Sequence, residues 1–152
     1  MATRSTTVHA SAVLVGARAA LIRGPSGSGK SRLALELIAA ARTGLLPFAR
    51  LVADDRVHLE AAGDRLLARP AEPLAGLIEV RGAGLLRLAY EASAVVGFVV
   101  DLAAADAARL PDAAGRKAEI EGVWLPRLAV ASGAAVLPGV LALITSAREG
   151  WA

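Results

Sequence analysis

The segment from Gly24 to Ser31 carries residue types whose spacing could hold phosphate groups. Its sequence, Gly-Pro-Ser-Gly-Ser-Gly-Lys-Ser, matches the Walker A pattern in full. The glycines allow the backbone to bend so that successive N–H groups point at phosphate oxygens. Lys30 can reach the outer phosphates as a cation, and the Ser31 hydroxyl can bind a bridging Mg²⁺. The predicted nucleotide-binding residues are Gly24, Pro25, Ser26, Gly27, Ser28, Gly29, Lys30 and Ser31.

The identity of the nucleotide is constrained by a residue type that the chain lacks. Ras-like GTPases recognise guanine with an Asn-Lys-x-Asp motif, and this chain contains no asparagine. The segment Thr145-Ser-Ala147 resembles another GTPase fragment, but it is an isolated match. ATP with Mg²⁺ is therefore the expected ligand of the Walker A segment.

Two strand ends could supply the carboxylate that P-loop proteins place near Mg²⁺. Val52-Ala-Asp-Asp55 offers a pair of acids, and Val99-Val-Asp101 offers one acid after the most hydrophobic run. In the pair, one carboxylate could contact the metal while the other accepts a proton from an attacking hydroxyl. Asp101 would suit a generic ATPase, and a turn with two solvated aspartates would have no chemical role. Spacing alone leaves these alternatives open.

Three further side chains are notable for their positions. His9 lies on the strand before the Walker A segment, where a lone histidine is more often structural than catalytic. Glu79 and Arg81 flank Val80, so they share one face of a strand. This charged pair fits an exposed sheet edge and an active site equally well.

The elements around these residues predict an α/β fold. A hairpin over residues 8–23 leads into the Walker A segment, and the spacing of apolar residues predicts a helix over 30–42. A surface loop is expected over 106–117 and a closing helix over 134–148. We predict a P-loop nucleotide-binding domain with a mixed, strand-rich sheet. The other strand patterns cover residues 50–55, 57–69 as a second hairpin, 77–81 before a break at 82–84, 95–102, and 118–130 as two short strands interrupted at Pro126.

Length and composition favour one domain over residues 1–152, with a loose terminus at 1–6. Hydrophobic residues make up 55% of the chain and charged residues 20%, so the chain can bury a core. The chain has no cysteine, which excludes disulfides and thiolate metal sites. Neither a signal peptide nor a membrane-spanning helix is expected, so the cytoplasm is the default location.

The positive charge of the chain is dispersed. The net charge is +3, and most of the excess comes from single arginines scattered along the sequence. Nucleic-acid-binding proteins usually concentrate their charge in a patch or stripe. Aromatic residues make up only 3% of the chain, which leaves few side chains for base stacking. Nucleic-acid binding is therefore not expected.

Four segments, taken in order, resemble the catalytic domain of HPr kinase/phosphorylase. The last of them is close to the family signature Leu-Glu-Val-Arg-Gly-x-Gly. The resemblance covers roughly residues 7–130, and the chain looks like the short proteobacterial form, which lacks the N-terminal domain of longer members. The four segments are His9, Gly24–Ser31, Leu51-Val-Ala-Asp-Asp55 and Ile78-Glu-Val-Arg-Gly-Ala-Gly84.

The resemblance implies transfer of the ATP γ-phosphate to a serine of HPr, a small phosphocarrier protein, by a homo-oligomer. The family's Pro-x-Arg-Pro-Gly-Arg loop, linked to the reverse reaction, is not present, and Leu125-Pro-Arg-Leu-Ala129 occupies the comparable region. The phosphorylase direction is therefore less well supported than the kinase direction. Two competing interpretations are a generic ATPase or small-molecule kinase that uses Asp101, and a nucleotide-sensing module without turnover.

The resemblance also implies roles for single residues. Asp55 would accept the proton of the attacking serine, and His9 and Lys30 would stabilise the phosphates. Arg109, within Ala108-Arg-Leu-Pro111, resembles a catalytic arginine of the family. The implied metal ligands are Ser31 and Glu79, with Asp54 nearby.

Overall fold

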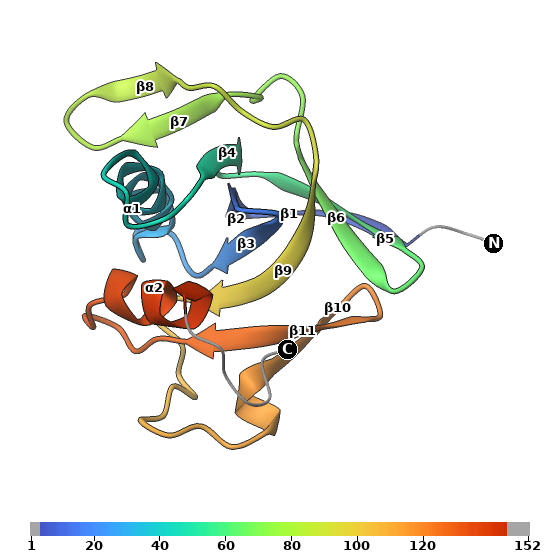
Figure 1. Cartoon of the computed structure of the whole chain (residues 1–152). Coiled ribbons are helices and arrows are strands. Elements are labelled where there is room, and N and C mark those ends of the chain that lie inside the picture. Colours follow the sequence, from blue (N-terminus) through green and yellow to red (C-terminus); the bar gives the residue numbers. More distant parts are fainter. Residues whose placement is uncertain (1–3, 146–152) are drawn as a thin grey trace.

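A computed structural model describes residues 4–145 of the chain (Figure 1). Its helices are α1 (Lys30–Arg42) and α2 (Leu137–Thr145), and a short 3₁₀ turn covers Ala114–Arg116. Its strands are β1 (Ser5–Val8), β2 (Ala10–Val15), β3 (Arg18–Arg23), β4 (Ala49–Ala53), β5 (Val57–Ala62), β6 (Arg65–Pro70), β7 (Leu77–Val80), β8 (Gly84–Arg87), β9 (Ala94–Asp101), β10 (Lys117–Ile120) and β11 (Val123–Ala129). No helix within residues 4–145 is long and apolar enough to cross a membrane.

The main sheet is mixed, as the sequence predicts. Its strands follow the order β1-β5-β6-β9-β3-β2-β4, and β11, paired with β10, also joins β9. The long strand β9 curves through the molecule (Figure 1). It lies parallel to β3 on one side, while β6 pairs with its first residues and β11 pairs in parallel with its last residues. The sheet therefore combines an antiparallel part with a parallel part built on β3, β9 and β11.

The three parallel strands end side by side. Arg23, the last residue of β3, pairs with Asp101, the last residue of β9, and Asp101 pairs with Ala129 at the end of β11. Ligands of α/β sheets bind outside the carboxyl ends of such strands. The register therefore brings the loops after β3, β9 and β11 to the edge where a nucleotide would be expected.

The strands at the centre of the sheet are buried on both faces. Leu21 and Ile22 of β3 are both fully buried but belong to different apolar clusters, and Val99 and Val100 of β9 are divided in the same way. Successive side chains of a strand point to opposite faces, which explains the division. Leu37 of α1 packs in the second cluster, so α1 covers one face of the sheet. This two-sided burial accounts for the continuous apolar runs in the sequence.

The N-terminal segment is more ordered than the sequence predicts. The expected loose terminus over residues 1–6 is wrong for Ser5 and Thr6, which begin β1 and pair with Glu60 and Leu59 of β5. β1 is an edge strand and only half-buried, so its side chains are mostly polar and do not form the apolar pattern that predicts a strand. Residues 1–3 lie outside the described part.

The break expected at 82–84 is the turn of a hairpin. Gly82 and Gly84 have φ angles of +88° and +87°, which L side chains rarely adopt. These angles reverse the chain, so that Val80 pairs with Gly84 and β8 runs back along β7. The two strands form a separate small sheet, which lies above α1 in Figure 1.

Two boundaries near the C-terminus also differ from the prediction. Pro126 does not interrupt the strands but lies inside β11, at the end of its pairing with β10 and before its pairing with β9 begins. The actual turn is at Glu121–Gly122. Helix α2 begins at Leu137 and not at 134, because Pro138 is tolerated only in the first turn of a helix. Residues 146–148 of the predicted helix lie outside the described residues.

Candidate active site

The Walker A segment forms a loop between β3 and α1. Gly24, Gly27 and Gly29 have φ angles of +157°, +81° and +102°, so the loop uses backbone conformations that favour glycine. A Cβ atom on Gly24 would lie 2.5 Å from Ser28 Oγ and 3.1 Å from the backbone oxygen of Leu102. The loop leads directly into the first turn of α1, whose free N–H groups and positive dipole end attract anions.

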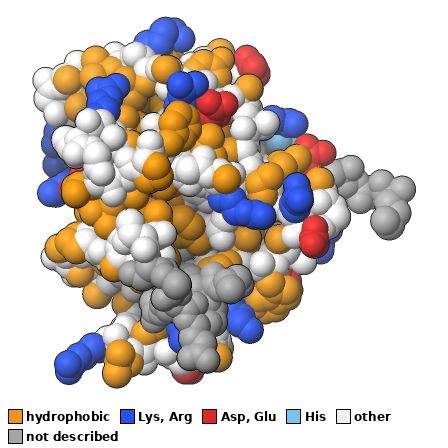
Figure 2. Space-filling view, viewed as in Figure 1, with side chains coloured by type: hydrophobic (Ala, Val, Ile, Leu, Met, Phe, Trp, Pro, Cys, Tyr) orange, Lys and Arg blue, Asp and Glu red, His pale blue; other side chains and the backbone are white. Residues whose placement is uncertain are grey.

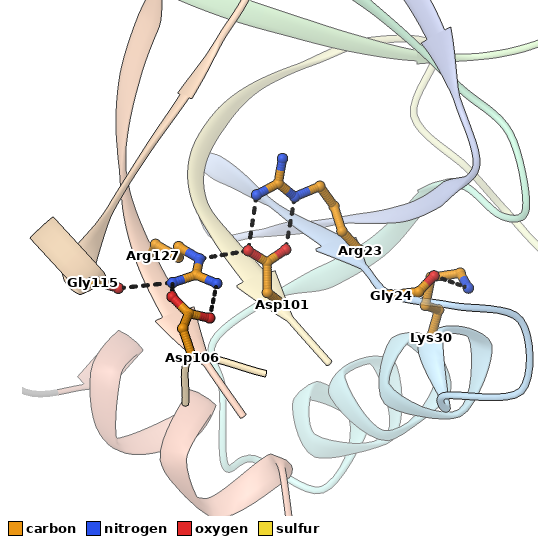
Figure 3. A network of polar contacts seen from close by, with 7 residues as sticks. All are labelled: Arg23, Gly24, Lys30, Asp101, Asp106, Gly115 and Arg127. Carbon is orange, nitrogen blue, oxygen red and sulfur yellow. Dashed lines mark hydrogen bonds and ion pairs between the residues drawn. The ribbon is translucent and has the colours of Figure 1, made fainter. Parts of the chain in front are cut away.

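Two side chains of the loop, those of Lys30 and Ser28, bring buried polar groups to it. Lys30 is only 7% exposed, and its Nζ donates to the carbonyl oxygens of Gly24 at 2.8 Å (Figure 3) and Pro25 at 3.0 Å. Ser28 Oγ is buried and has no hydrogen-bond partner among the described residues. A buried hydroxyl without a partner is uncommon in proteins. The loop is therefore shaped and charged to fit a phosphate group.

Asp54 is a buried carboxylate with three hydrogen-bond donors. Its side chain is 5% exposed, although it lies just beyond the end of β4. Oδ1 accepts from Ser11 Oγ and from Ser31 Oγ, each at 2.7 Å. Oδ2 accepts from the backbone N–H of Glu79 at 3.3 Å. The strand end thus places a carboxylate against the Walker A hydroxyl, and Mg²⁺ in nucleotide sites is usually bound by one or two carboxylates together with substrate phosphates.

Asp55 faces a different environment from its neighbour. Its side chain is 61% exposed, and Oδ1 lies 2.6 Å from Nε2 of His9. Its φ angle of +68° is uncommon for a residue other than glycine, and such conformations cluster at functional sites. The interpretation as a turn with two solvated aspartates is therefore wrong for Asp54. One carboxylate is buried against Ser31, and the other is open and hydrogen-bonded to a histidine.

Asp101 is bound by two arginines (Figure 3). Arg23 donates to both of its oxygens, at 2.7 and 2.8 Å, and Arg127 Nε donates to Oδ2. Burial alone would raise the pKa of Asp101, but the hydrogen bonds and charges of the two arginines outweigh it and lower the pKa. A carboxylate saturated in this way is a poor proton acceptor and has little free capacity for a metal. The geometry therefore does not favour the generic ATPase that uses Asp101.

The same network fastens the loop over residues 102–116. Arg127 has a side chain 12% exposed and forms a two-pronged ion pair with Asp106, at 2.8 Å for each bond. It also donates to the backbone oxygen of Gly115 at 3.1 Å. The hydrogen bond with Asp106 is the main cause of the raised pKa of Arg127, and it lowers the pKa of Asp106. Both ends of the loop are thus tied to the edge of the parallel strands.

Comparison with known proteins identifies the family of the chain. The model of the HPr serine kinase C-terminal domain matches residues 1–130. The chain belongs to this family. Two HPr kinase/phosphorylases of Streptococcus pneumoniae, from strains Hungary19A-6 and ATCC BAA-255 / R6, are each 38% identical over 136 residues, which is 82% of this chain. The match spans 42% and 41% of those relatives, respectively.

A solved structure supports the fold assignment. The Hpr(Ser) kinase/phosphatase from Coxiella burnetii superimposes with a TM-score of 0.73 and covers 91% of this chain and 88% of that one. Its sequence identity of 22% extends the comparison to the fold alone. The mixed, strand-rich α/β architecture predicted from the sequence is confirmed.

Not all residues that the HPr kinase resemblance implied come together. Five of them lie at the Walker A loop and the end of β4, in the contacts described above: His9, Lys30, Ser31, Asp54 and Asp55. The backbone of Glu79 reaches Asp54, but its side chain is exposed on β7. Arg109 is exposed on the loop after β9 and joins no hydrogen bond or ion pair within residues 4–145. No group of three His, Asp or Glu side chains in that range could hold a metal by itself.

Three residues that shape the candidate site were not predicted from the sequence. Ser11 is a polar residue inside an apolar strand pattern, which indicates a buried polar contact. Arg23 follows the apolar run of β3, and a charged residue at a strand end is too common to indicate a functional role. Arg127 had no signal, because its meeting with Asp101 depends on the parallel pairing of β11 with β9.

Proposed function

We propose that this chain transfers the γ-phosphate of ATP to a serine of an HPr-like phosphocarrier protein. One observation carries the proposal: two adjacent carboxylates at the end of β4 are divided between a Walker A hydroxyl and a histidine. The bond from Ser31 to Asp54 is 2.7 Å long, and the contact of His9 with Asp55 is 2.6 Å long. Asp54 would therefore lie on the side of the metal, and Asp55 would be a base that the hydroxyl of a protein substrate can reach.

The residues of the Walker A loop fit a Mg²⁺–ATP complex. The unpartnered Ser28 hydroxyl and the buried Lys30 ammonium both support a phosphate in the cradle, and the lack of a Cβ at Gly24 lets the loop pack closely against Leu102. Bound Mg²⁺ would neutralise charge on the phosphates during transfer. Ser31 and Asp54 would hold it, and we retain Glu79 as a further candidate ligand.

Asp55 is suited to accept the proton of the attacking serine. Its side chain is open to solvent, so a protein substrate can approach it. The contact with His9 fixes the orientation of the carboxylate, which a positioned base requires. Lys30 supplies a positive charge to the transferred group, and we propose that Arg109 approaches the phosphates only when substrate is bound.

The protein substrate is proposed from the names of the relatives. The Streptococcus pneumoniae relatives are HPr kinase/phosphorylases, and this chain spans about two fifths of their length. From the length, the composition and the family resemblance of the sequence we further propose a single domain over residues 1–152, a homo-oligomer and a cytoplasmic location. Arginine and lysine side chains are scattered over the visible face rather than gathered in a patch, which supports the expectation of no nucleic-acid partner (Figure 2).

The proposal is tested by phosphate transfer in a purified system. The chain is mixed with labelled ATP, Mg²⁺ and an HPr-like protein, and the label is sought on serine by mass spectrometry. The matched control is the same carrier with its acceptor serine replaced by alanine, which should remain unlabelled. Release of phosphate from ATP without labelling of the carrier would point to an ATPase instead. Binding of ATP with neither reaction would point to a nucleotide sensor.

A further inference from the structure

Ser11 belongs to a small set of buried polar side chains. Within residues 4–145, the buried polar or charged side chains are Ser11 at 0%, Asp54 at 5% and Lys30 at 7% exposed. Lys30 and Asp54 are both part of the proposed nucleotide site. The third member, Ser11, lies on β2 and has no role in the family resemblance. Its burial beside the other two calls for a physical explanation.

The packing of β2 does not require a hydroxyl at this position. Ala10, Ala12 and Val13 are also fully buried, and all are apolar. Ser11 pairs with Ile22 of β3, which is equally buried. A buried hydroxyl costs free energy unless it is hydrogen-bonded, and an alanine would suit such surroundings. The hydroxyl is therefore explained by its hydrogen bond and not by the packing of the strand.

That hydrogen bond ends on Asp54. Ser11 Oγ donates to Oδ1 at 2.7 Å, and the same oxygen accepts from Ser31 Oγ at 2.7 Å. The bond from the backbone of Glu79 to Oδ2 is longer, at 3.3 Å. Ser11 and Ser31 thus supply the two short bonds to this carboxylate, one from β2 and one from α1.

Ser11 is also the end of a three-residue segment that contacts both carboxylates. His9 Nε2 meets the side chain of Asp55, and the backbone N–H of Ala10 donates to the backbone oxygen of Asp55 at 3.2 Å. Ser11 then reaches Asp54. Three consecutive residues therefore fix the positions of both aspartates relative to β2.

We propose that Ser11 is a positioning residue, which holds Asp54 so that the Ser31 hydroxyl presents its lone pairs to the metal. This inference rests on the proposed Mg²⁺–nucleotide site. A serine hydroxyl has one proton, and Ser31 gives it to Asp54 Oδ1. The lone pairs of Ser31 then point away from Asp54. Ser11 keeps that acceptor oxygen in place, because it donates to the same oxygen from β2, whereas Ser31 donates from α1.

The test uses three variants, two of which differ from each other only in the hydroxyl. Ser11→Thr keeps the donor, whereas Ser11→Val has the same shape without it, so both have the same added bulk in the strand. Ser11→Ala removes the donor without added bulk. Mn²⁺ is titrated into each protein with saturating ADP, and free Mn²⁺ is measured by electron paramagnetic resonance. ADP affinity without metal and thermal unfolding are measured on the same samples.

We expect Ser11→Ala and Ser11→Val to bind Mn²⁺ about 10-fold more weakly than the wild type and Ser11→Thr, as for other residues that orient metal ligands. ADP affinity without metal should be equal in all four proteins. Equal Mn²⁺ affinity in the valine and threonine variants would overturn the positioning role. If the bulkier variants fail to fold, equal affinity in Ser11→Ala and the wild type overturns it in the same way.

The titration separates this inference from the proposed function. It requires no phosphocarrier protein, so failure to label HPr leaves the test of Ser11 intact. If the wild type binds ADP and Mn²⁺ but Ser11→Ala binds them equally well, only the role of Ser11 is wrong. If the wild type binds no Mn²⁺ in the presence of ADP, the nucleotide site is wrong, and the role of Ser11 is overturned with it.

Discussion

Asp54 and Asp55 are neighbours in the chain but have opposite environments. Asp54 is buried, whereas Asp55, with its positive φ angle, has a side chain that is 61% exposed. Two adjacent carboxylates in one environment would repel each other. Here the hydrogen bonds from Ser11 and Ser31 hold one carboxylate, and the contact with His9 holds the other. The pair can therefore divide metal binding and proton transfer between its members.

Asp55→Asn is expected to lower the rate of phosphate transfer by about 10²–10⁴-fold, the usual contribution of a general base. An amide keeps the shape of the side chain but cannot accept the proton. Binding of ATP should be unchanged, because the Walker A loop and Asp54 are intact. Single-turnover transfer to the carrier and equilibrium binding of a fluorescent ATP analogue measure the two quantities separately.

Asp101→Asn is the matched control for the base. Asp101 is held by Arg23 and Arg127, so its replacement should leave the transfer rate per folded molecule within a few-fold of the wild type. Loss of transfer at Asp101 with retention at Asp55 would reverse the assignment in favour of the generic ATPase.

Glu79→Gln is expected to raise the Mg²⁺ concentration needed for half-maximal transfer, and excess Mg²⁺ should restore the rate. Mg²⁺ prefers charged oxygen ligands, and even loss of an outer partner typically costs about 10-fold in metal affinity. The backbone N–H of Glu79 still reaches Asp54 in the variant, so only the carboxylate is tested. A Mg²⁺ titration at saturating ATP gives the answer.

Arg81→Gln serves as the control on the same hairpin. Arg81 is exposed, as Glu79 is, and lies two residues further on. If both side chains are only solvated surface groups, each change should alter stability by about 0–1 kcal/mol and leave the kinetics alone. Superimposable titration curves for the wild type and Glu79→Gln would remove Glu79 from the metal site.

At the scale of elements, β3, the Walker A loop and α1 were predictable from local patterns. An apolar run, glycines at fixed spacing and a period of 3.6 residues each have one physical interpretation. β8 and the course of β11 were not predictable in the same way. β8 depends on two glycines with positive φ angles, and β11 tolerates Pro126 because of where its ladders begin and end. Local signals locate an element well only where the element is internally regular.

The ion pairs of Asp101 show the same limit for side chains. Arg23, Asp101 and Arg127 come from three separate strands, which only the parallel pairing aligns. In the sequence, Asp101 resembled a strand-end acid available to a metal. In the structure Asp101 connects β9 with β3 and β11, and its partner Arg23 directly precedes Gly24 of the Walker A loop (Figure 3).

This connecting role predicts how stability depends on pH. The pKa of Asp101 is lowered in the folded protein, so its contribution to stability is present above the unfolded pKa of about 3.9. The contribution is lost as the pH falls through the lower folded value. The difference in unfolding free energy between the wild type and Asp101→Asn should therefore be largest near neutral pH and shrink in acid.

Urea unfolding at about pH 6, pH 4 and pH 3 measures this difference. Asp64→Asn is the control, because Asp64 is exposed in the turn between β5 and β6 and joins no ion pair in the described residues. Its difference from the wild type should be small and nearly constant. A difference for Asp101→Asn that stays constant down to pH 3 would mean that the arginines do not favour the charged form.

At the scale of the whole molecule, the candidate site draws on most layers of the fold. Asp54 follows β4, Ser11 lies on β2, Ser31 on α1 and the N–H of Glu79 on β7. These elements also share the apolar cluster that α1 buries against the sheet. A ligand that engages them together binds the native state only, because the unfolded chain cannot gather these groups. Binding should therefore stabilise the molecule as one unit.

Mg²⁺–ADP is accordingly expected to raise the melting temperature of the wild type. At a ligand concentration of about 100 times Kd, the stabilisation is about 2.7 kcal/mol, which for a chain of this size corresponds to roughly 5–10 °C. Lys30→Ala should lose most of this shift, because the variant removes the buried ammonium that contacts Gly24 and Pro25 of the phosphate cradle. Lys30→Ala removes a buried group, so the ligand-induced shift is compared and not the melting temperature itself.

Differential scanning fluorimetry with Mg²⁺–ADP, ADP alone and Mg²⁺ alone measures the ligand-induced shift. Equal shifts in the wild type and Lys30→Ala would mean that the nucleotide binds elsewhere, and the Walker A loop would lose its assigned role.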